Sequence, residues 1–195
     1  NNITITDIEN DEFLQNNIVG KIGISTPTMM KGYYNNEMAT KDITHDGFDG
    51  NKVIDTGDIG FMDSDGHLFV IGRLKRLIVR SGKKITPMDI ENLLLSLPEI
   101  STCLVVGAPD EKEKSVPVAH IVLKNEYNGI PKEKLIKKMK SLIVSTYPNF
   151  MIPKYFVFRS ALPLTQMTKI DFVQLELESA EIDFQNHEYV DITDK

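Results

Sequence analysis

The pattern of apolar residues changes between residues 73 and 76, and this change constrains the fold more than any other feature of the chain. Before it, VGKIGIS (19–25) alternates in polarity as a half-buried strand does. DIGFMD and HLFVIGR then flank an Asp-Gly pair at 65–66, which predicts a β-hairpin. The polar, glycine-dotted residues 35–52 predict a surface loop. This part of the chain is therefore expected to be β-rich with turns.

After this point, strand and helix patterns are mixed. RLIVR (76–80) predicts a short strand, and Ser81-Gly82 predicts a turn in which glycine supplies a positive φ. The segment 86–89, Thr-Pro-Met-Asp, has the residues of a capped helix start, and a lysine-rich amphipathic run further on predicts a second helix. Residues 168–171, Thr-Lys-Ile-Asp, predict the start of a last helix with a similar cap. With the β-rich runs between them, these elements indicate an α+β fold.

These patterns divide the chain into three segments. Residues 1–74 are expected to be a piece of a larger β-rich body, residues 75–178 a compact unit with a small sheet flanked by helices, and residues 179–195 a mobile acidic tail. The chain begins at Asn1 rather than Met, which indicates that it is part of something longer.

Composition argues against several classes of function. A formal net charge of −6 argues against general nucleic-acid binding, which depends on neutralising phosphates. The single cysteine, Cys103, lies among apolar neighbours and is expected to be a buried, inert thiol, so the reducing cytoplasm is the expected compartment. No apolar run approaches the roughly 20 residues of a transmembrane segment. The four histidines show no metal-ligand spacing, and no metal site is predicted in this chain.

Three polar residues are candidates for chemistry from their surroundings alone. Asp58, in DTGD between two strand-like stretches, can accept hydrogen bonds from two neighbouring hydroxyls such as those of a ribose, although a plain turn is the simpler interpretation. Arg73 ends the hairpin strand, where a surface ion pair is the simpler interpretation. Lys169 stands beside a predicted helix N-terminus, where the helix dipole disfavours a cation. A bound anion would relieve that conflict, and a solvated lysine is the alternative.

Taken in order, four motifs change this assessment. PTMMKGYYNNEMAT, DTGDIGFMDSDGHLFVIGR, LKRLIVRSGKKITPMDIE and, further on, PLTQMTKID together resemble the adenylate-forming enzymes, which include acyl-CoA synthetases, luciferases and the adenylation domains of peptide synthetases. The resemblance covers roughly residues 18–178. It implies that residues 75–178 are the C-terminal lid domain of such an enzyme and that residues 1–74 are the end of its large N-terminal domain.

The resemblance also implies a reaction. A carboxylic acid attacks the α-phosphate of ATP to give an acyl-adenylate and pyrophosphate; the lid then rotates, and the thiol of CoA captures the acyl group and releases AMP. The chain would be the C-terminal portion of an AMP-forming acyl-CoA synthetase, an acid–thiol ligase of the kind that serves fatty acid metabolism. Its partners would be ATP, CoA, a carboxylic acid and the missing N-terminal domain. The Mg²⁺ that accompanies ATP would be held outside this chain.

Individual roles follow from the same resemblance. In such enzymes the aspartate matching Asp58 holds the ribose hydroxyls, and the arginine matching Arg73 contacts the nucleotide. The residue matching Lys75 is the hinge, and the lysine matching Lys169 reaches the reacting carboxylate and phosphate during adenylation. The turn matching Ser81-Gly82 faces the pantetheine arm of CoA in the second conformation.

Two positions depart from the family pattern: Thr168 replaces the usual glycine before the adenylation lysine, and Arg76 stands where acyl-CoA synthetases more often have an acidic residue. The family's phosphate loop, its adenine- and magnesium-binding segment and its acyl pocket all precede Asn1, so the isolated chain is expected to be inactive. ITPMDIE favours the acyl-CoA form, since peptide-synthetase domains read closer to IELGEIE. The alternatives are a ligase that loads a carrier protein and a non-catalytic module that docks on a partner.

Overall fold

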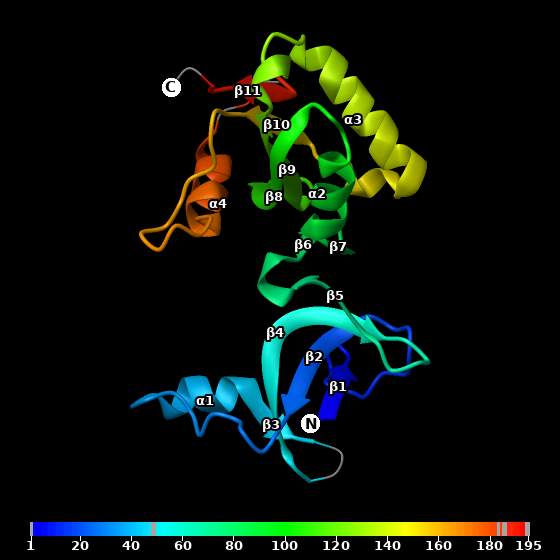
Figure 1. Cartoon of the computed structure of the whole chain (residues 1–195), viewed down its shortest axis with the longest axis vertical. Coiled ribbons are helices and arrows are strands. Elements are labelled where there is room, and N and C mark those ends of the chain that lie inside the picture. Colours follow the sequence, from blue (N-terminus) through cyan, green and yellow to red (C-terminus); the bar gives the residue numbers. More distant parts are fainter. Residues whose placement is uncertain (1, 48–49, 183, 185–186, 194–195) are drawn as a thin grey trace. The chain divides into compact units, whose positions relative to one another are not determined.

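The computed structural model describes residues 2–47, 50–182, 184 and 187–193 (Figure 1). The chain divides into two compact units between Lys75 and Arg76. Helices and strands occur together, which confirms the predicted α+β class. No helix within the described ranges is long and apolar enough to span a membrane.

The first unit is built on an antiparallel sheet whose described strands run in the order β1-β2-β4-β3, with β5 also paired to β4. Its elements are β1 (Asn2–Thr6), β2 (Gly20–Ser25), α1 (Glu37–Ile43), β3 (Thr44–Asp46), β4 (Lys52–Met62) and β5 (Leu68–Arg73). The long strand β4 pairs with β3 at one end and with β5 at the other. The predicted hairpin is confirmed, with Gly66 in its turn at φ +85°.

The prediction of a loop over residues 35–52 is wrong, because this segment contains α1 and β3. Asn36 caps α1 by accepting a hydrogen bond from the backbone N of Ala39 (3.0 Å), and β3 pairs with β4. Helix α1 contains no buried residue. A short helix without a buried face leaves no apolar periodicity in the sequence, which is why the segment has the pattern of a loop.

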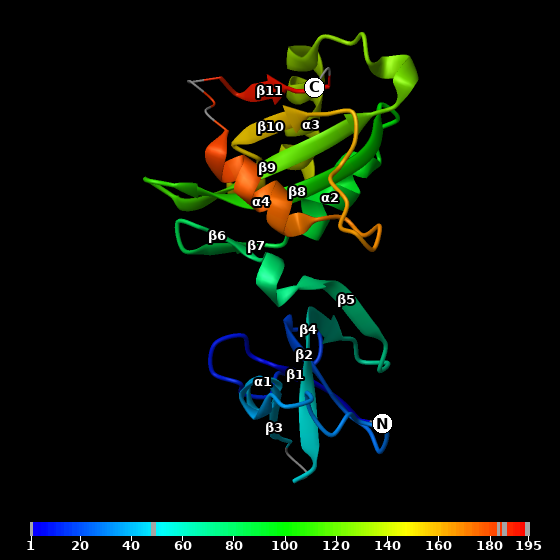
Figure 2. The same ribbon diagram turned by 90° about the vertical axis from the view of Figure 1, so that its left-hand side faces the viewer.

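The second unit is a sheet covered by helices on both faces (Figures 1 and 2). The described strands are, in the order β11-β10-β9-β8, Tyr189–Asp191, Tyr155–Phe158, Lys114–Leu123 and Ile100–Asp110. Strands β8 and β9 form an antiparallel hairpin, and β10 lies parallel to β9 and to β11. Helices α2 (Pro87–Leu95) and α3 (Lys132–Thr146) pack on one face and α4 (Phe172–Glu181) on the other. A two-stranded hairpin, β6 (Ile78–Arg80) and β7 (Lys83–Ile85), and 3₁₀ turns at Leu74–Arg76, Asn125–Tyr127 and Asn149–Met151 complete the second half of the chain.

Alternation along the strands sorts the apolar residues of this sheet onto its two faces. In β8, Cys103 and Val105 join the core formed with α2 and α3, whereas Leu104 joins the core formed with α4. In β10, Phe156 and Val157 divide in the same way. Cys103 is buried as predicted, and burial raises the pKa of its thiol, which makes it a poor nucleophile.

Helix α4 begins later than the sequence predicts. Its N-cap is Asp171 and not Thr168: the Asp171 carboxylate accepts a hydrogen bond from the backbone N of Gln174 (3.0 Å). Thr168 lies in the preceding loop with φ +58°, and its hydroxyl donates to the carbonyl of Met167. The last residue of the Thr-x-x-Asp pattern, Asp171, is therefore the N-cap, and not its first residue, Thr168.

Several described residues of the segment expected as a mobile acidic tail, 179–195, pack on the second unit. Ser179 is buried in α4, the Phe184 ring stacks on Tyr155 with centroids 3.8 Å apart, and Tyr189 belongs to β11. A few apolar anchors inside an acidic stretch are enough to order it. The rest of this call, at 183, 185–186 and 194–195, lies outside the described residues.

Candidate functional site

Asp58 is positioned by an irregularity in the pairing of β2 with β4. Thr56 Oγ1 donates to the carbonyl of Ile22 (2.9 Å) and accepts from the backbone N of Asp58 (3.1 Å), so one hydroxyl bridges the interrupted ladder. Gly57, between them, has φ +76°, a conformation that favours glycine. The DTGD motif is therefore a bulge inside one strand, and the expectation of a turn between two strands is wrong in this respect.

Arg73 lies directly opposite Asp58 in the pairing of β4 with β5, and its Nε is 3.2 Å from Asp58 Oδ1. The Asp58 side chain is 30% exposed and the Arg73 side chain 71% exposed. A solvent-screened pair of this kind contributes only about 0–1 kcal/mol to stability. The carboxylate can, however, accept hydrogen bonds from hydroxyls while the exposed guanidinium beside it donates to a phosphate at the same place.

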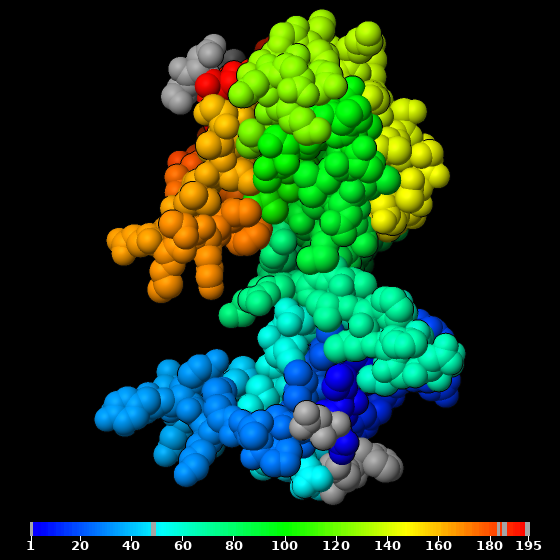
Figure 3. Space-filling view, viewed as in Figure 1, coloured from blue at the N-terminus to red at the C-terminus, as the bar shows by residue number. Residues whose placement is uncertain are grey.

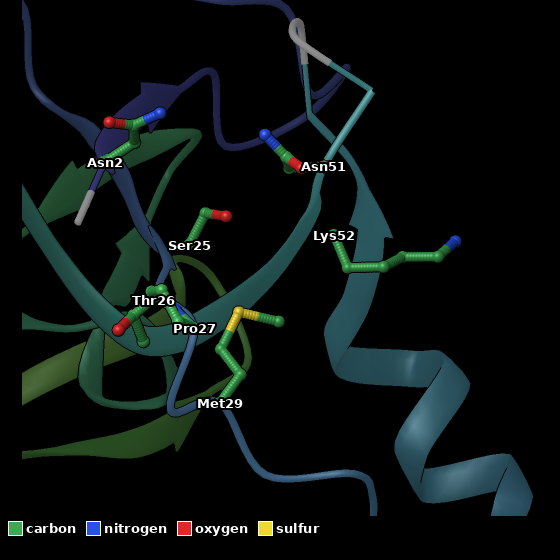
Figure 4. A pocket seen from close by; sticks show the side chains of 7 residues that line it. All are labelled: Asn2, Ser25, Thr26, Pro27, Met29, Asn51 and Lys52. Atoms are coloured by element: carbon green, nitrogen blue, oxygen red, sulfur yellow. The ribbon is translucent and has the colours of Figure 1, made fainter.

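A hollow of about 330 Å³ lies elsewhere in the first unit (Figure 4). It is lined by Asn2, Ser25, Thr26, Pro27, Met29, Asn51 and Lys52. Neither Asp58 nor Arg73 lines it, and its lysine is already paired with Asp46 at 2.6 Å. The hollow therefore does not belong to the predicted site.

Three side chains at the β4–β5 turn, Asp63, Asp65 and His67, have potential metal-ligand atoms within 4.8 Å of one another. Local hydrogen bonds account for this grouping, because Asp63 Oδ1 accepts from the backbone N of Asp65 (3.0 Å) and of His67 (2.8 Å). The hydrogen bond from the His67 backbone is also the main cause that lowers the pKa of Asp63 below its usual range. The grouping is a turn motif, and we assign no metal to it.

Lys169 lies on a narrow loop, residues 163–171, that projects from the second unit and is drawn in orange (Figures 1 and 3). Two backbone hydrogen bonds close the loop: Asp171 N donates to Pro163 O (2.9 Å), and Thr165 N donates to Lys169 O (2.7 Å). The Lys169 side chain is exposed and lies two residues before the N-cap of α4. An ammonium held in this way on a closed loop is accessible to an anion.

Thr168 is strained where the family resemblance expects a glycine. Its φ of +58° lies in the left-handed region, which costs a residue with a Cβ roughly 1–2 kcal/mol. A hydrogen bond from Thr168 N to Thr165 O (2.9 Å) helps to hold this conformation. The conformation of the loop thus suits glycine, and threonine makes the backbone before Lys169 stiffer.

Ser81 and Gly82 form the exposed turn between β6 and β7, and both have a positive φ, +47° and +79°. Ser81 N donates to Glu113 O (2.9 Å), which ties this turn to the turn between β8 and β9. Arg80 binds the Glu113 carboxylate (Nε to Oε2, 2.6 Å), and that hydrogen bond lowers the pKa of Glu113. Arg80, whose role the sequence left open, therefore anchors the turn.

Lys75 and Arg76, on either side of the boundary between the units, have different surroundings. Lys75 is exposed, whereas Arg76 forms an ion pair with Glu91 of α2. Glu91 Oε1 also accepts a hydrogen bond from Val105 N (2.8 Å). Glu91 was not among the predicted site residues, although its position on the apolar face of α2 is a usable signal, because a buried carboxylate needs a partner.

The structure brings only some of the predicted site residues together. Asp58 and Arg73 are in contact within the first unit. Lys169 and the turn at Ser81-Gly82 occupy two different loops of the second unit. Lys75 is the last residue of the first unit.

Residues 89–169 match the family model described as the AMP-binding enzyme C-terminal domain. With the fold and the four motifs, this match shows that the chain carries the C-terminal domain of the adenylate-forming, AMP-binding enzymes.

The relatives that it resembles are CoA ligases. The chain is 36% identical to the 2-succinylbenzoate–CoA ligase of Bacillus licheniformis over 151 residues, which cover 77% of this chain and 29% of that protein. It is 38% identical to 4-coumarate–CoA ligase 1 of Glycine max over 141 residues, which cover 72% of this chain and 46% of that protein. Among solved structures, the ATP-bound RpMatB-BxBclM chimera is similar, with a TM-score of 0.83 and 28% identity over 93% of this chain and 35% of its own. The chain spans less than half of the length of each of these three proteins.

Proposed function

We propose that this chain is the C-terminal portion of an AMP-forming acid–thiol ligase, an acyl-CoA synthetase that joins a carboxylic acid to CoA through an acyl-adenylate. One observation carries the proposal: the segment that matches the family's C-terminal domain ends at the exposed Lys169, in a chain whose curated relatives are CoA ligases. The free, buried thiol of Cys103 supports the reducing cytoplasm as its compartment.

Each candidate residue has a task that its surroundings support. Asp58 would hold the ribose hydroxyls, and the exposed Arg73 beside it would donate to the nucleotide. Lys169 would stabilise the charge that develops as the carboxylate attacks the α-phosphate. After the lid turns at Lys75, the turn at Ser81-Gly82 would face the pantetheine arm of CoA. We assign the Mg²⁺ that accompanies ATP to residues outside this chain.

The first prediction concerns Lys169. In the intact enzyme, Lys169→Ala should slow acyl-adenylate formation by about 10²–10³-fold, the effect of losing one donor that acts mainly on the transition state. It should spare thioester formation from supplied acyl-adenylate. Both half-reactions are to be measured separately, with Lys134→Ala, an exposed lysine of α3, as the matched control and the 195-residue chain alone as the inactive control. Equal losses in the two half-reactions would contradict the assignment.

The alternative functions differ in the acceptor. A carrier-protein-loading ligase would use the same lysine but transfer the acyl group to a pantetheinylated protein, and a docking module would bind no nucleotide. Offering free CoA and a pantetheinylated carrier in parallel to the adenylate-loaded enzyme separates these cases. We expect transfer to CoA, and transfer to the carrier alone would replace our proposal with the first alternative.

A further inference from the structure

Arg76 joins three elements of the second unit around one guanidinium. Its side chain is 17% exposed and pairs with Glu91 of α2, whose side chain is 7% exposed. The guanidinium also donates to the carbonyl of Val105 in β8 (3.3 Å). Arg76 Cζ lies 4.3 Å from the centre of the ring of Phe172, the first residue of α4. One planar cation therefore contacts α2, β8 and α4.

Phe172 stands at the base of the Lys169 loop. Its neighbour Asp171 both caps α4 and closes the loop, through the hydrogen bond from Asp171 N to Pro163 O (2.9 Å). Lys169 lies three residues before Phe172, inside the closed loop. The ring therefore lies next to the point at which the loop leaves the body of the unit, where Leu162 and Ile170 pack against the same core.

The rest of α4 is anchored by other contacts. Leu175 is fully buried, and Ser179 Oγ lies 2.7 Å from His120 Nε2 in β9. These contacts hold the middle and the end of the helix, whereas Phe172 packs only partly buried at its first turn. Loss of the contact between Arg76 and Phe172 is therefore expected to loosen the loop and to leave α4 folded.

We propose that Arg76 is a positioning residue, which holds the Lys169 loop in place for adenylation through the ring of Phe172. A guanidinium suits this task, because it pairs with a carboxylate in its plane while its face covers an aromatic ring. Since Arg76 follows Lys75 directly, the same contact links the loop to the point at which we propose that the lid turns. The catalytic part of this inference rests on the proposed function; the structural part rests on the contacts alone.

Hydrogen exchange in the 195-residue chain tests the contact without reference to activity. Phe172→Leu removes the ring and leaves the Arg76–Glu91 pair. The hydrogen-bonded amides of Thr165 and Asp171 should then exchange about 3- to 30-fold faster, the range expected for one partly desolvated cation–ring contact. Phe172→Tyr keeps the ring and should behave as the unmodified chain does. Unchanged loop exchange in Phe172→Leu would overturn the proposal.

A second variant avoids dependence on one substitution. Arg76→Lys keeps a charge for Glu91 but lacks the planar face, so it should also accelerate exchange in the loop and leave the amides of β9 as they are. Lys132→Met is the matched control, because it removes a different cation from a different ring, with Lys132 Nζ 5.2 Å from the centre of the Phe158 ring. Equal acceleration of the loop in this control would mean a general loss of stability and would overturn the proposal.

Activity measurements test the catalytic part of the inference about Arg76. In the intact enzyme, Phe172→Leu should lower the rate of acyl-adenylate formation by about 3- to 30-fold and spare transfer from supplied acyl-adenylate to CoA. Equal losses in both steps would remove the positioning role. An unmodified enzyme that forms no acyl-adenylate would instead refute the proposed function, and the exchange experiment would still decide whether Arg76 holds the loop.

Discussion

The second unit covers both faces of its sheet with helices, whereas the first unit leaves large apolar side chains of a sheet strand in solvent. In the second unit Val105, Ile121 and Phe156 are fully buried. In the first unit the adjacent residues Phe69 and Val70 of β5 are 45% and 53% exposed. Neighbouring strand residues point to opposite faces, so both faces of β5 are open.

This difference indicates that the two units have different structural roles. The second unit encloses a complete core of its own. In the first unit, Tyr34 is 93% and Met38 77% exposed, and exposed apolar residues in such numbers are typical of a surface that contacts other protein. We infer that the first unit contributes to a larger body, in agreement with two relatives of which the matched residues make up only 29% and 46%.

The largest effect should come from breaking the core of the second unit. Phe156→Ala removes a fully buried ring, and we expect the free energy of unfolding of that unit to fall by about 3–5 kcal/mol. The first unit should keep its stability. Urea unfolding followed by residue-resolved hydrogen exchange separates the two units, with the exposed Val173→Ala as control. A matching loss in the first unit would show that the two units unfold as one.

The next prediction concerns the stability of the first unit and a substitution in its sheet. A Cβ on Gly60 would stand 2.1 Å from Phe69 O and 2.9 Å from Ile22 Cδ1. Gly60→Ala should therefore lower the stability of the first unit by about 1–3 kcal/mol. Gly129→Ala, at a position with open space around it in the second unit, is the control. If the same denaturation assay shows no change for Gly60→Ala, the close approach of β5 to β4 is not as described.

A buried histidine should give the second unit its own pH dependence. His120 is enclosed: Arg159 donates to its Nδ1 (3.3 Å), Ser179 Oγ lies 2.7 Å from its Nε2, and Arg159 also binds Glu178 (3.0 Å). Burial, with the charge of Arg159, lowers the pKa of His120 to about 3. The unfolded chain takes up a proton near pH 6.5 and the folded chain does not, so this contribution to stability is lost as the pH falls from 6.5 toward 3.

We expect the second unit to lose about 2 kcal/mol from this group between pH 7 and pH 5. His120→Gln keeps hydrogen-bonding groups without a titration and should flatten the curve in that range. In the first unit, the lowered pKa of Asp63 gives a contribution that is lost only below about pH 4. Unfolding curves of both units at pH 7, 6 and 5 check the difference, and parallel losses in the two units would contradict it.

The sequence predicted the fold where apolar residues repeat with a clear period. The strand at 20–25 and the β4–β5 hairpin follow from alternation and from the Asp-Gly turn. Helix α1 was not predicted, because none of its residues is buried and its sequence therefore shows no apolar face. Strand β7 was not predicted, because two of its three residues are exposed lysines. The packing of the last segment was not predicted either, because it depends on isolated apolar residues such as Phe184.

In the candidate site, too, local sequence patterns predicted some features and not others. Asp58, Arg73 and Lys169 were predicted from local motifs, since each motif is a continuous stretch of chain. The surroundings of Arg76 were not found, because its partners Glu91 and Val105 lie 15 and 29 residues away in the sequence. Contacts of that kind depend on how helices pack on the sheet, which a single sequence pattern does not contain.

The most direct test of the account is Lys75→Pro in the intact enzyme, with the two half-reactions measured separately and Lys75→Ala as control. Proline fixes φ near −65°, a value within the range of the 3₁₀ turn that contains Lys75. It also forbids a large change of φ at residue 75, which a hinge at this position needs. We expect acyl-adenylate formation to stay largely intact and capture by CoA to slow by about tenfold or more, roughly 1.4 kcal/mol in the barrier. A thioester step as fast as in Lys75→Ala would contradict a lid that turns between the two units.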